Sequence, residues 1–188
     1  IIPFSLGFPG IKDDPNECTF WAHCHYAYHA IDENGHVWTW GRYGHDSIYS
    51  MTGTNSNAWT PINLMKLSNS ANAFNPEDGL QSAKAVAMGG GSQSYSSAGI
   101  LGTDGKVYMC GYNGYGQLGV GDADQRTTLT EVPCRDQIVE ATFTGHERYT
   151  NLQVRLADGQ MLIAGCGDNY QLASEDGEEY YTLSPVRF

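Results

Sequence analysis

The apolar residues of this chain fall in short runs of strand length, with turn-forming residues between them. Three pairs of runs share one layout: an apolar run, a two-residue turn signal of Asn or Asp with Gly, and a second run. The first runs are residues 26–31, 98–101 and 152–156, the turn signals are Asn34-Gly35, Asp104-Gly105 and Asp158-Gly159, and the second runs are residues 37–40, 107–110 and 161–164. Because these dipeptides supply the positive φ that a tight turn needs, the pattern predicts three β-hairpins.

Further runs extend the hairpins into small sheets. Residues 83–88 and 138–143 predict an additional strand in the second and third units, and the runs around Ile62 and Val132 close their units. Each sheet is therefore expected to have three or four antiparallel strands. No stretch sustains an apolar period of 3.6 residues, so helices should be few and short and the fold class is all-β.

The shared layout reflects an internal repeat. Residues 35–62, 105–132 and 159–186 align without gaps over 28 positions, at offsets of 70 and 54. Self-similarity at this period indicates stacked or radially arranged units. The spacing between the first two units exceeds that between the last two by 16 residues, and the excess is rich in Asn, Ser and Ala, which indicates an inserted loop.

Residues 104–122, DGKVYMCGYNGYGQLGVGD, carry a motif that resembles the repeat of the regulator of chromosome condensation family. That repeat reads roughly DG-x-V-Y-x-W-G-x-N-x-x-G-Q-L-G-x-G-D. The second unit departs from it at Cys110, where the family usually has Trp and the first unit keeps Trp40. The third unit keeps Gln171, Leu172 and Asp176 but loses the later glycines, and the first unit departs after NGHVWTWG. The resemblance covers most of residues 25–188.

This resemblance implies a β-propeller, usually of seven blades, in which each blade is a four-stranded sheet. We predict one repeat domain over residues 1–188. It comprises a first blade with an N-terminal segment at 1–62, an inserted loop at 63–82, a second blade at 83–132 and a third blade at 133–188. Three blades cannot close the circle, so either further blades lie in a longer parent chain or several copies complete one another. A homo-oligomer or part of a larger assembly is expected, and the lack of an initial Met indicates a processed product or an excised piece.

Composition excludes several classes of function. A net charge of -11 with ten Lys and Arg leaves few cations for phosphates, so nucleic acid is not expected as a partner. The apolar start of the chain is far shorter than the ~20 residues of a membrane span, so membrane insertion is not expected either. Five cysteines without paired CxxC motifs indicate neither a disulfide framework nor a zinc ribbon.

The densest group of metal-capable side chains lies near the N-terminus. On a single extended strand His23, His25 and His29 would share one face and could converge on one metal ion. The alternative is that they are partly buried strand residues beside the first blade. Cys18 and Cys24 could pair if a turn brings them together.

Acidic loops raise the question of a bound cation. Glu175, Asp176, Glu178 and Glu179 lie around Gly177, and Asp122 and Asp124 occupy the matching place one unit earlier. Calcium would need such oxygen ligands, but the spacing does not resemble a helix-loop-helix calcium site. A carboxylate that caps backbone amides in the loop is the favoured interpretation.

Tyrosines in turns are the clearest functional signal. Tyr43, Tyr112, Tyr115 and Tyr170 are the predicted partner-binding residues, because Tyr offers a large contact area at low entropic cost and stacks on sugars or on partner side chains. Trp59 aligns with Leu129 and Leu183, so it is expected to pack inside its blade.

These observations favour a non-enzymatic recognition or adhesion module that binds a protein or glycan receptor, such as a component of a phage tail fibre, outside the cell or on a virion. The alternative is an intracellular regulator, in the cytoplasm or nucleus, that acts on a small GTPase or docks on chromatin, as the resemblance implies. No nucleophile-elbow pattern and no phosphate-binding loop ending in Lys-Ser/Thr occurs. No catalytic residue is therefore predicted, and no cofactor beyond the cation sites considered above.

Overall fold

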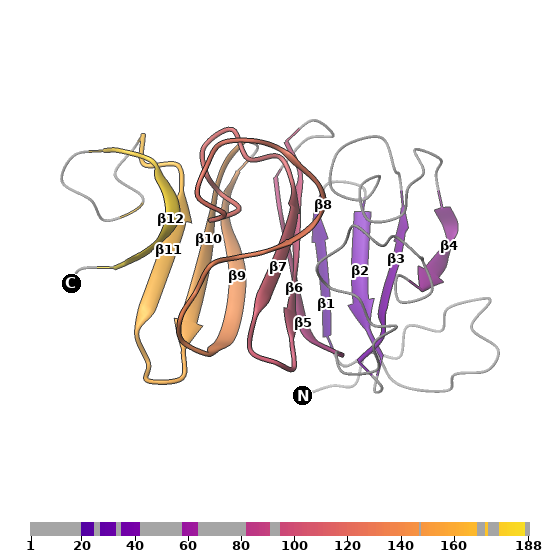
Figure 1. Cartoon of the computed structure of the whole chain (residues 1–188). Coiled ribbons are helices and arrows are strands. Elements are labelled where there is room, and N and C mark those ends of the chain that lie inside the picture. Colours follow the sequence, from indigo (N-terminus) through magenta and orange to yellow (C-terminus); the bar gives the residue numbers. More distant parts are fainter. Residues whose placement is uncertain are drawn as a thin grey trace.

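A computed structural model of the chain contains three four-stranded antiparallel sheets (Figure 1). It describes residues 20–24, 27–32, 35–41, 58–63, 82–90, 95–146, 148–168, 172 and 177–186. All the secondary structure in these residues is β-strand, with no helix among them. The predicted all-β class, with antiparallel blades of a partial propeller, is confirmed.

The strands of each sheet follow one another in sequence order, so each sheet is a meander. The first sheet contains β1 (Phe20–Cys24), β2 (Ala27–Ile31), β3 (Val37–Gly41) and β4 (Ala58–Asn63). The second contains β5 (Ala83–Gly89), β6 (Ser97–Gly102), β7 (Val107–Gly111) and β8 (Arg126–Glu131). The third contains β9 (Ile138–His146), β10 (Tyr149–Leu156), β11 (Met161–Gly165) and β12 (Tyr180–Pro185).

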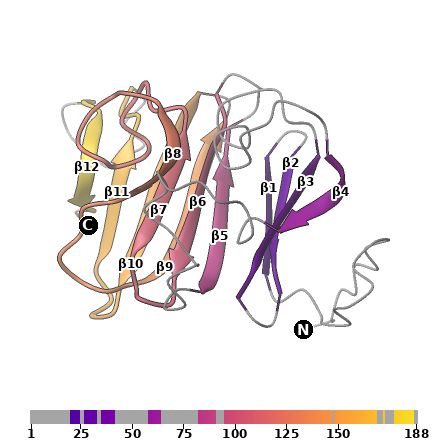
Figure 2. The same ribbon diagram turned by 45° about the vertical axis from the view of Figure 1, so that its right-hand side comes forward.

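The sheets are arranged side by side with their first strands adjacent. β1 contacts β5, and β5 contacts β9, whereas the fourth strands lie at the other edge of each sheet. In the turned view of Figure 2 the first sheet stands apart from the second and third, which overlap. This arrangement is radial, with β1, β5 and β9 as the inner strands of consecutive blades.

The turns between the second and third strands are longer than the two-residue signal predicted. In the second sheet Gly102 N donates to Lys106 O (2.9 Å) and Gly105 N to Gly102 O (3.1 Å), which leaves a three-residue loop. Gly105 has a φ of 79°, and Asp104 Oδ1 accepts a hydrogen bond from Lys106 N at 3.0 Å. A turn that ends in one glycine with positive φ is the usual three-residue hairpin, so the Asp-Gly pair specified the hairpin but not its length.

The apolar core lies between neighbouring sheets rather than within one sheet. Along β7, Val107 and Met109 face the third sheet, where they join a buried cluster with residues of β9 and β10. Its buried members are Leu101, Val107, Met109, Leu118, Val132, Ile138, Ala141, Leu152, Val154, Leu156 and Leu162. The alternate residues Tyr108 and Cys110 are also buried, with at most 1% exposed. Both faces of β7 are therefore covered, which is why this strand reads as a continuous apolar run.

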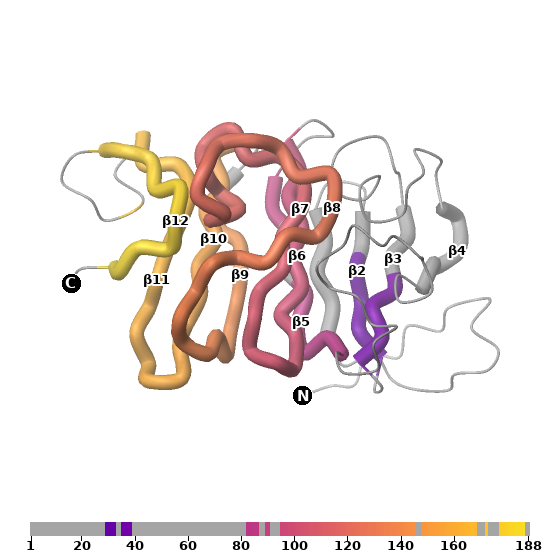
Figure 3. The backbone as a smooth tube through the Cα atoms, in the orientation of Figure 1, coloured from indigo at the N-terminus to yellow at the C-terminus, as the bar shows by residue number. Residues whose placement is uncertain are grey.

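The β7–β8 loop of the second blade packs against the third blade. Leu118, in the β7–β8 loop, belongs to the buried cluster, and Val120 forms a β-bridge with Thr182 of β12. Gly121 N also donates to Tyr181 O at 2.8 Å. Figure 3 shows this loop arching away from β7 before the chain returns as β8. The second unit thus contributes both a sheet and a strap across the outer strand of its neighbour.

The same hydrogen bond occurs twice, between the hairpin that joins the second and third strands of one blade and the start of the next blade. The carbonyl of the hairpin glycine in one blade accepts from the first strand residue of the next, Gly35 O from Ala83 N at 2.8 Å and Gly105 O from Ile138 N at 2.9 Å. A Cβ on Gly35 would lie 2.5 Å from Ser82 Cβ and 3.0 Å from Ala83 O. Gly35 is therefore required both for its positive φ and for this close approach between blades.

We predict that Gly35→Ala lowers the free energy of unfolding by about 2–4 kcal/mol, because the methyl group adds a clash to an unfavourable φ. Gly159→Ala is the matched control: Gly159 has a φ of 93°, but nothing described lies within 4 Å of its Cβ position. It should cost only the conformational part, about 1–2 kcal/mol. Chemical denaturation measures both, and equal losses would show that the interblade contact is not tight.

Candidate functional site

Five half-buried side chains from three loops meet at one end of the second and third sheets. We call them the rim cluster: Tyr95, Tyr112, Tyr115, Arg148 and Tyr149. Tyr95 precedes β6, Tyr112 and Tyr115 follow β7, and Arg148 and Tyr149 lie at the turn from β9 to β10. Because alternate strands of a meander run in opposite directions, these three loops fall at the same end of their sheets.

The four aromatic rings form a continuous chain across the two blades. The Tyr95 and Tyr112 rings have centroids 4.9 Å apart at an interplanar angle of 74°. Tyr112 and Tyr115 are 6.5 Å apart at 62°, and Tyr115 and Tyr149 are 5.3 Å apart at 45°. These separations are within the range in which edge-to-face and tilted ring pairs attract.

Arg148 adds a positive charge to this aromatic surface. Its Cζ lies 4.9 Å from the centroid of the Tyr149 ring, and its Nη2 donates a 2.7 Å hydrogen bond to Tyr149 Oη. That hydrogen bond raises the pKa of Arg148, so its guanidinium stays protonated. Burial is the largest cause of the raised pKa of the Tyr112 and Tyr115 hydroxyls, which therefore stay neutral hydrogen-bonding groups.

The buried side chain of Gln117 links two of the loops that carry the rim cluster. Its side chain is fully buried, and its Oε1 accepts a hydrogen bond from Tyr115 N at 3.0 Å. Its Nε2 donates to Arg148 O at 3.2 Å and lies 3.4 Å from Thr150 Oγ1. One amide thus fixes the β7–β8 loop of the second blade against the β9–β10 turn of the third. This is the Gln of the repeat motif, so a residue of the fold motif positions the site.

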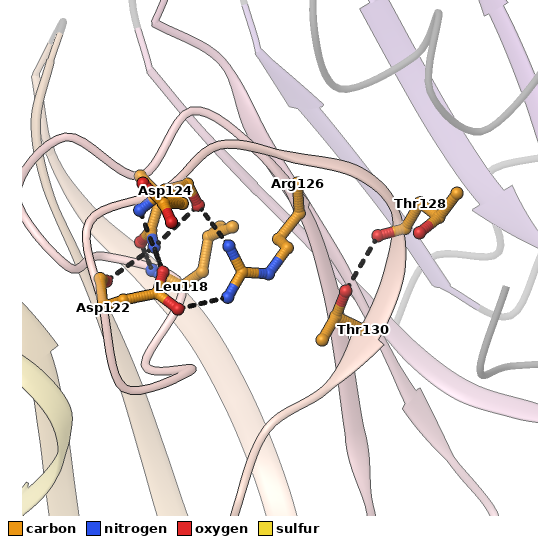
Figure 4. Close-up of polar contacts among 7 residues, drawn as sticks. Leu118, Asp122, Asp124, Arg126, Thr128 and Thr130 are labelled. Atoms are coloured by element: carbon orange, nitrogen blue, oxygen red, sulfur yellow. Dashed lines mark hydrogen bonds and ion pairs between the residues drawn. The ribbon is translucent and has the colours of Figure 1, made fainter. Parts of the chain in front are cut away.

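The acidic loop of the second unit is internally satisfied (Figure 4). Asp122 Oδ1 accepts from Asp124 N at 2.9 Å, and Asp122 Oδ2 forms a 2.6 Å ion pair with Arg126 Nη2. Arg126 Nη1 also donates to Asp124 O at 2.7 Å. The favoured interpretation, a carboxylate that caps a backbone amide, describes Asp122 well. Asp176 and Glu175 of the third unit lie outside the described residues.

Asn113 closes the same loop from the other side. Its Nδ2 donates to Asp122 O at 2.8 Å and to Asp124 O at 3.1 Å, while its Oδ1 accepts from Leu118 N at 2.9 Å. Asn113 is fully buried. The Asn and Asp of the motif therefore shape the loop that places Leu118 in the core and Tyr115 at the rim.

The predicted histidine site depended on a single extended strand, and that premise is wrong. His23 belongs to β1 and pairs with Tyr28, whereas His29 belongs to β2 and pairs with Ala22. Paired residues share a face and neighbours alternate, so positions 23 and 29 lie on opposite faces of the sheet. His29 is fully buried, both ring nitrogens lack a hydrogen-bond partner among the described residues, and burial lowers its pKa to about 3.

His25 and Cys18 lie outside the described residues, so metal binding by this segment stays a prediction. Within the described part of the chain, no group of three or more His, Cys, Asp or Glu could hold a metal ion. Cys110, Cys134 and Cys166 form no disulfide within the described residues, and burial raises the pKa of the Cys110 thiol. The described ranges also contain no helix that is both long and apolar enough to cross a membrane.

The structure brings two of the four predicted partner-binding residues together. Tyr112 and Tyr115 belong to the rim cluster, whereas Tyr43 and Tyr170 lie outside the described residues. Sequence reasoning missed Tyr95, Arg148 and Tyr149. A signal for two of them existed, because Tyr95 and Tyr149 are separated by the repeat offset of 54 and so occupy one position in successive units. That position lies upstream of the 28 aligned residues.

Comparison with known proteins agrees with this geometry. The family model of the regulator of chromosome condensation (RCC1) repeat matches residues 104–141, which span β7, β8 and the start of β9. Residues 104–141 therefore contain an RCC1-type repeat. Comparison with curated protein sequences gives no significant match.

Solved propellers share the fold of this array. Human WBSCR16 matches with a TM-score of 0.66 and 16% identity, over 92% of this chain and 40% of that protein. Yeast RCC1 (Prp20), solved bound to Kap60, matches with a TM-score of 0.64 and 13% identity, over 91% and 37%. A second Saccharomyces cerevisiae Prp20p structure, reported with its binding properties to Gsp1p and histones, gives 0.59 and 17%, over 88% and 37%. The chain spans about two fifths of the length of these proteins.

We predict that Gln117→Ala lowers the free energy of unfolding by about 1–3 kcal/mol, because it leaves the partly buried Tyr115 N–H and Arg148 carbonyl without their partner. Near-ultraviolet circular dichroism of the tyrosines should weaken as the rim cluster loosens. Gln153→Ala is the control, since its one side-chain bond, to Thr144, is exposed and its loss should cost less than about 0.5 kcal/mol. Unchanged denaturation and dichroism of Gln117→Ala would contradict this role.

A second prediction concerns pH. The hydrogen bond from Arg126 and then the bond from Asp124 N hold the pKa of Asp122 below its ordinary value. A depressed carboxyl pKa gives stability that is present above the unfolded pKa and is lost as pH falls through the folded pKa. Thermal unfolding between neutral and strongly acid pH should show a larger loss for the wild type than for Asp122→Asn. Parallel curves would show that Asp122 carries none of this dependence.

Proposed function

We propose that this chain is a non-catalytic protein-binding module and that its partner contacts the rim cluster. The observation that carries the proposal is the meeting of four tyrosines and one arginine from two blades, held in place by the buried Gln117. Tyr and Arg are enriched among the residues that dominate binding energy at protein interfaces. Rings fixed in advance lose little further entropy when a partner binds.

Charge favours a basic partner. The chain carries a net charge of -11, and the carboxylate of Glu179 lies near the loop that carries Tyr115. A Cβ on Gly116 would lie 2.7 Å from Tyr181 Cδ1, so Tyr181 of β12 is next to the loop that carries Tyr115. Tyr181 Oη in turn donates to Glu179 Oε2 at 3.3 Å. Lysine or arginine side chains of a partner could pair with such carboxylates and lie over the tyrosine rings.

The relatives favour a protein partner inside the cell. Prp20 was solved with Kap60, and its second structure was reported with binding to Gsp1p and histones. These are properties of Prp20, which shares the fold at low identity and is much longer than this chain. They support the alternative predicted from the sequence, a regulator of a small GTPase or a chromatin-docking propeller in the nucleus or cytoplasm, over an extracellular adhesin.

Glycan binding is a second candidate, because exposed tyrosine rings also stack on sugars. It would use the same rim cluster and corresponds to the receptor-binding component of a phage tail fibre. Nothing in the comparisons points to a phage or virion origin. The two candidates therefore differ in the partner and not in the surface.

The test measures binding of the purified chain to core histones, to a small GTPase and to a glycan array. We expect Tyr115→Ala to weaken binding to a basic protein at least about tenfold and raised ionic strength to weaken it further. Lys106→Ala is the control, since Lys106 lies on the hairpin at the opposite end of the same sheet and its ion pair with Glu131 is exposed.

Each outcome assigns the site differently. Accelerated nucleotide release from the GTPase, lost in Tyr115→Ala, would identify the partner as a GTPase. Binding to glycans alone would replace the protein partner by a sugar. Protein binding that Tyr115→Ala and Tyr149→Ala leave unchanged would overturn the assignment of the rim cluster.

A further inference from the structure

Arg148 of the rim cluster has no carboxylate partner among the described residues, although the chain has 21 acidic and ten basic residues. Three other cations in the same part of the chain each form an ion pair with a carboxylate at 2.6–2.9 Å: Lys106, Arg126 and Arg155. The one side-chain hydrogen bond of Arg148 goes instead to the hydroxyl of Tyr149. A half-buried charge of this kind gains most from a partner of opposite sign.

Contacts on both the backbone and the side chain hold Arg148 in place. Its carbonyl accepts the hydrogen bond from Gln117 Nε2 at 3.2 Å, and its Cζ lies 4.9 Å from the centroid of the Tyr149 ring. Only Nη2 of the guanidinium donates to a described residue, so the other N–H groups have no partner there. A guanidinium fixed in this way loses little entropy when it binds a further group.

The groups around this guanidinium are hydrogen-bond donors rather than carboxylates. The hydrogen bond to Tyr149 and then the charge interaction with Tyr115 raise the pKa of Arg148, and no carboxylate contributes. Burial is the largest cause of the raised pKa of the Tyr115 hydroxyl, which therefore stays a protonated donor. A cation flanked by phenol hydroxyls suits an oxygen anion, either a carboxylate or a phosphate.

The charge of the chain separates these two anions. The second charge of a phosphate would be repelled by a net charge of -11, and Arg148 is the one cation of the rim cluster. A carboxylate carries a single charge, and its two oxygens match the planar fork of a guanidinium. The rim cluster therefore fits a carboxylate better than a phosphate.

Neighbouring blades do not compete for this position. The second and third blades pack through the faces of their sheets, where residues of β7, β9 and β10 form the buried cluster. Arg148 lies instead in the turn from β9 to β10, at the ends of the strands. Further blades that pack face to face would close a ring without covering the ends of these strands.

We propose that Arg148 selects partners that present an aspartate or glutamate side chain to the rim cluster. The inference rests on the proposed function and describes the partner further: its basic residues lie towards Glu179, and one carboxylate pairs with Arg148. Two charges of opposite sign would fix the register of the partner along the row of tyrosine rings.

The first measurement uses acetate as the probe for a side-chain carboxylate, on the wild-type protein at its natural length. Phenylglyoxal modifies accessible arginines, and peptide mass spectrometry measures the rate at Arg148 and at Arg135. Arg135 is the control, because it is exposed and forms no ion pair with a described residue. Acetate replaces chloride at constant ionic strength, which keeps screening unchanged.

We expect about 0.1 M acetate to slow the modification of Arg148 at least about threefold and that of Arg135 less than about twofold. Inorganic phosphate should protect Arg148 less than acetate does. Equal protection of the two arginines would show an adventitious interaction and would overturn the proposal. Stronger protection of Arg148 by phosphate would also overturn it, because the site would then take a phosphate.

The second measurement uses the sign of a charge effect in the protein-binding assay described above. A partner with only cations at this point would bind Arg148→Gln more tightly, because a repulsive charge is gone. We expect Arg148→Gln to weaken binding at least about tenfold and Arg148→Lys, which keeps the charge, to weaken it less. Arg135→Gln removes the same charge in the connection from β8 to β9 and should change affinity less than about twofold.

The outcomes separate this inference from the proposed function. Near-ultraviolet circular dichroism checks that the tyrosines of Arg148→Gln keep their packing. Binding that Tyr115→Ala weakens but Arg148→Gln leaves unchanged or tighter would overturn the inference and leave the proposed function in place. If no protein binds through Tyr115, the proposed function fails and this inference fails with it. Weaker binding of Arg148→Gln, together with acetate protection of Arg148, supports both.

Discussion

Close approach of neighbouring sheets is the constraint on which the rest of this structure depends. Small side chains on β5 and β6 of the second sheet allow β9 and β10 to approach, and Leu118 fills the remaining space between the two sheets. The carbonyls of the hairpin glycines Gly35 and Gly105 accept a hydrogen bond from the next blade, which lies too close to leave room for a Cβ. Apolar burial between blades therefore takes the place of a single central core, and each blade depends on its neighbour for stability.

The same constraint explains what could be predicted from the sequence. Hairpins, antiparallel sheets and the all-β class followed from local signals, because short apolar runs and Asp-Gly turns act within a few residues. The three-residue length of the turns did not follow, since it depends on how Asp104 and Gly105 share hydrogen bonds in the folded loop. The strand premise at the N-terminus failed for a related reason. A strand and a tight hairpin have similar composition, and only the pairing of His23 with Tyr28 shows where the chain reverses.

The candidate site was only partly accessible to sequence reasoning. Tyr112 and Tyr115 were predicted because they are tyrosines in turns, but Arg148 and Tyr149 come from the following unit and meet them only through folding. Gln117 links the loop of Tyr115 to the turn of Arg148. The motif describes a single repeat unit, so it does not show this contact between two units. Residues such as Gln117 repeat across units and define the scaffold, whereas the site arises where two units touch.

The bridge between Val120 and Thr182 and the hydrogen bonds of Gln117 have a consequence for how such proteins diversify. The rim cluster belongs to the junction of two particular units rather than to either unit. Duplicating one unit copies its sheet but not this surface, while exchanging the neighbour of the second unit would replace half of the surface in one step. Gene rearrangements that change the order of units could therefore create or erase recognition surfaces without altering any residue of the scaffold.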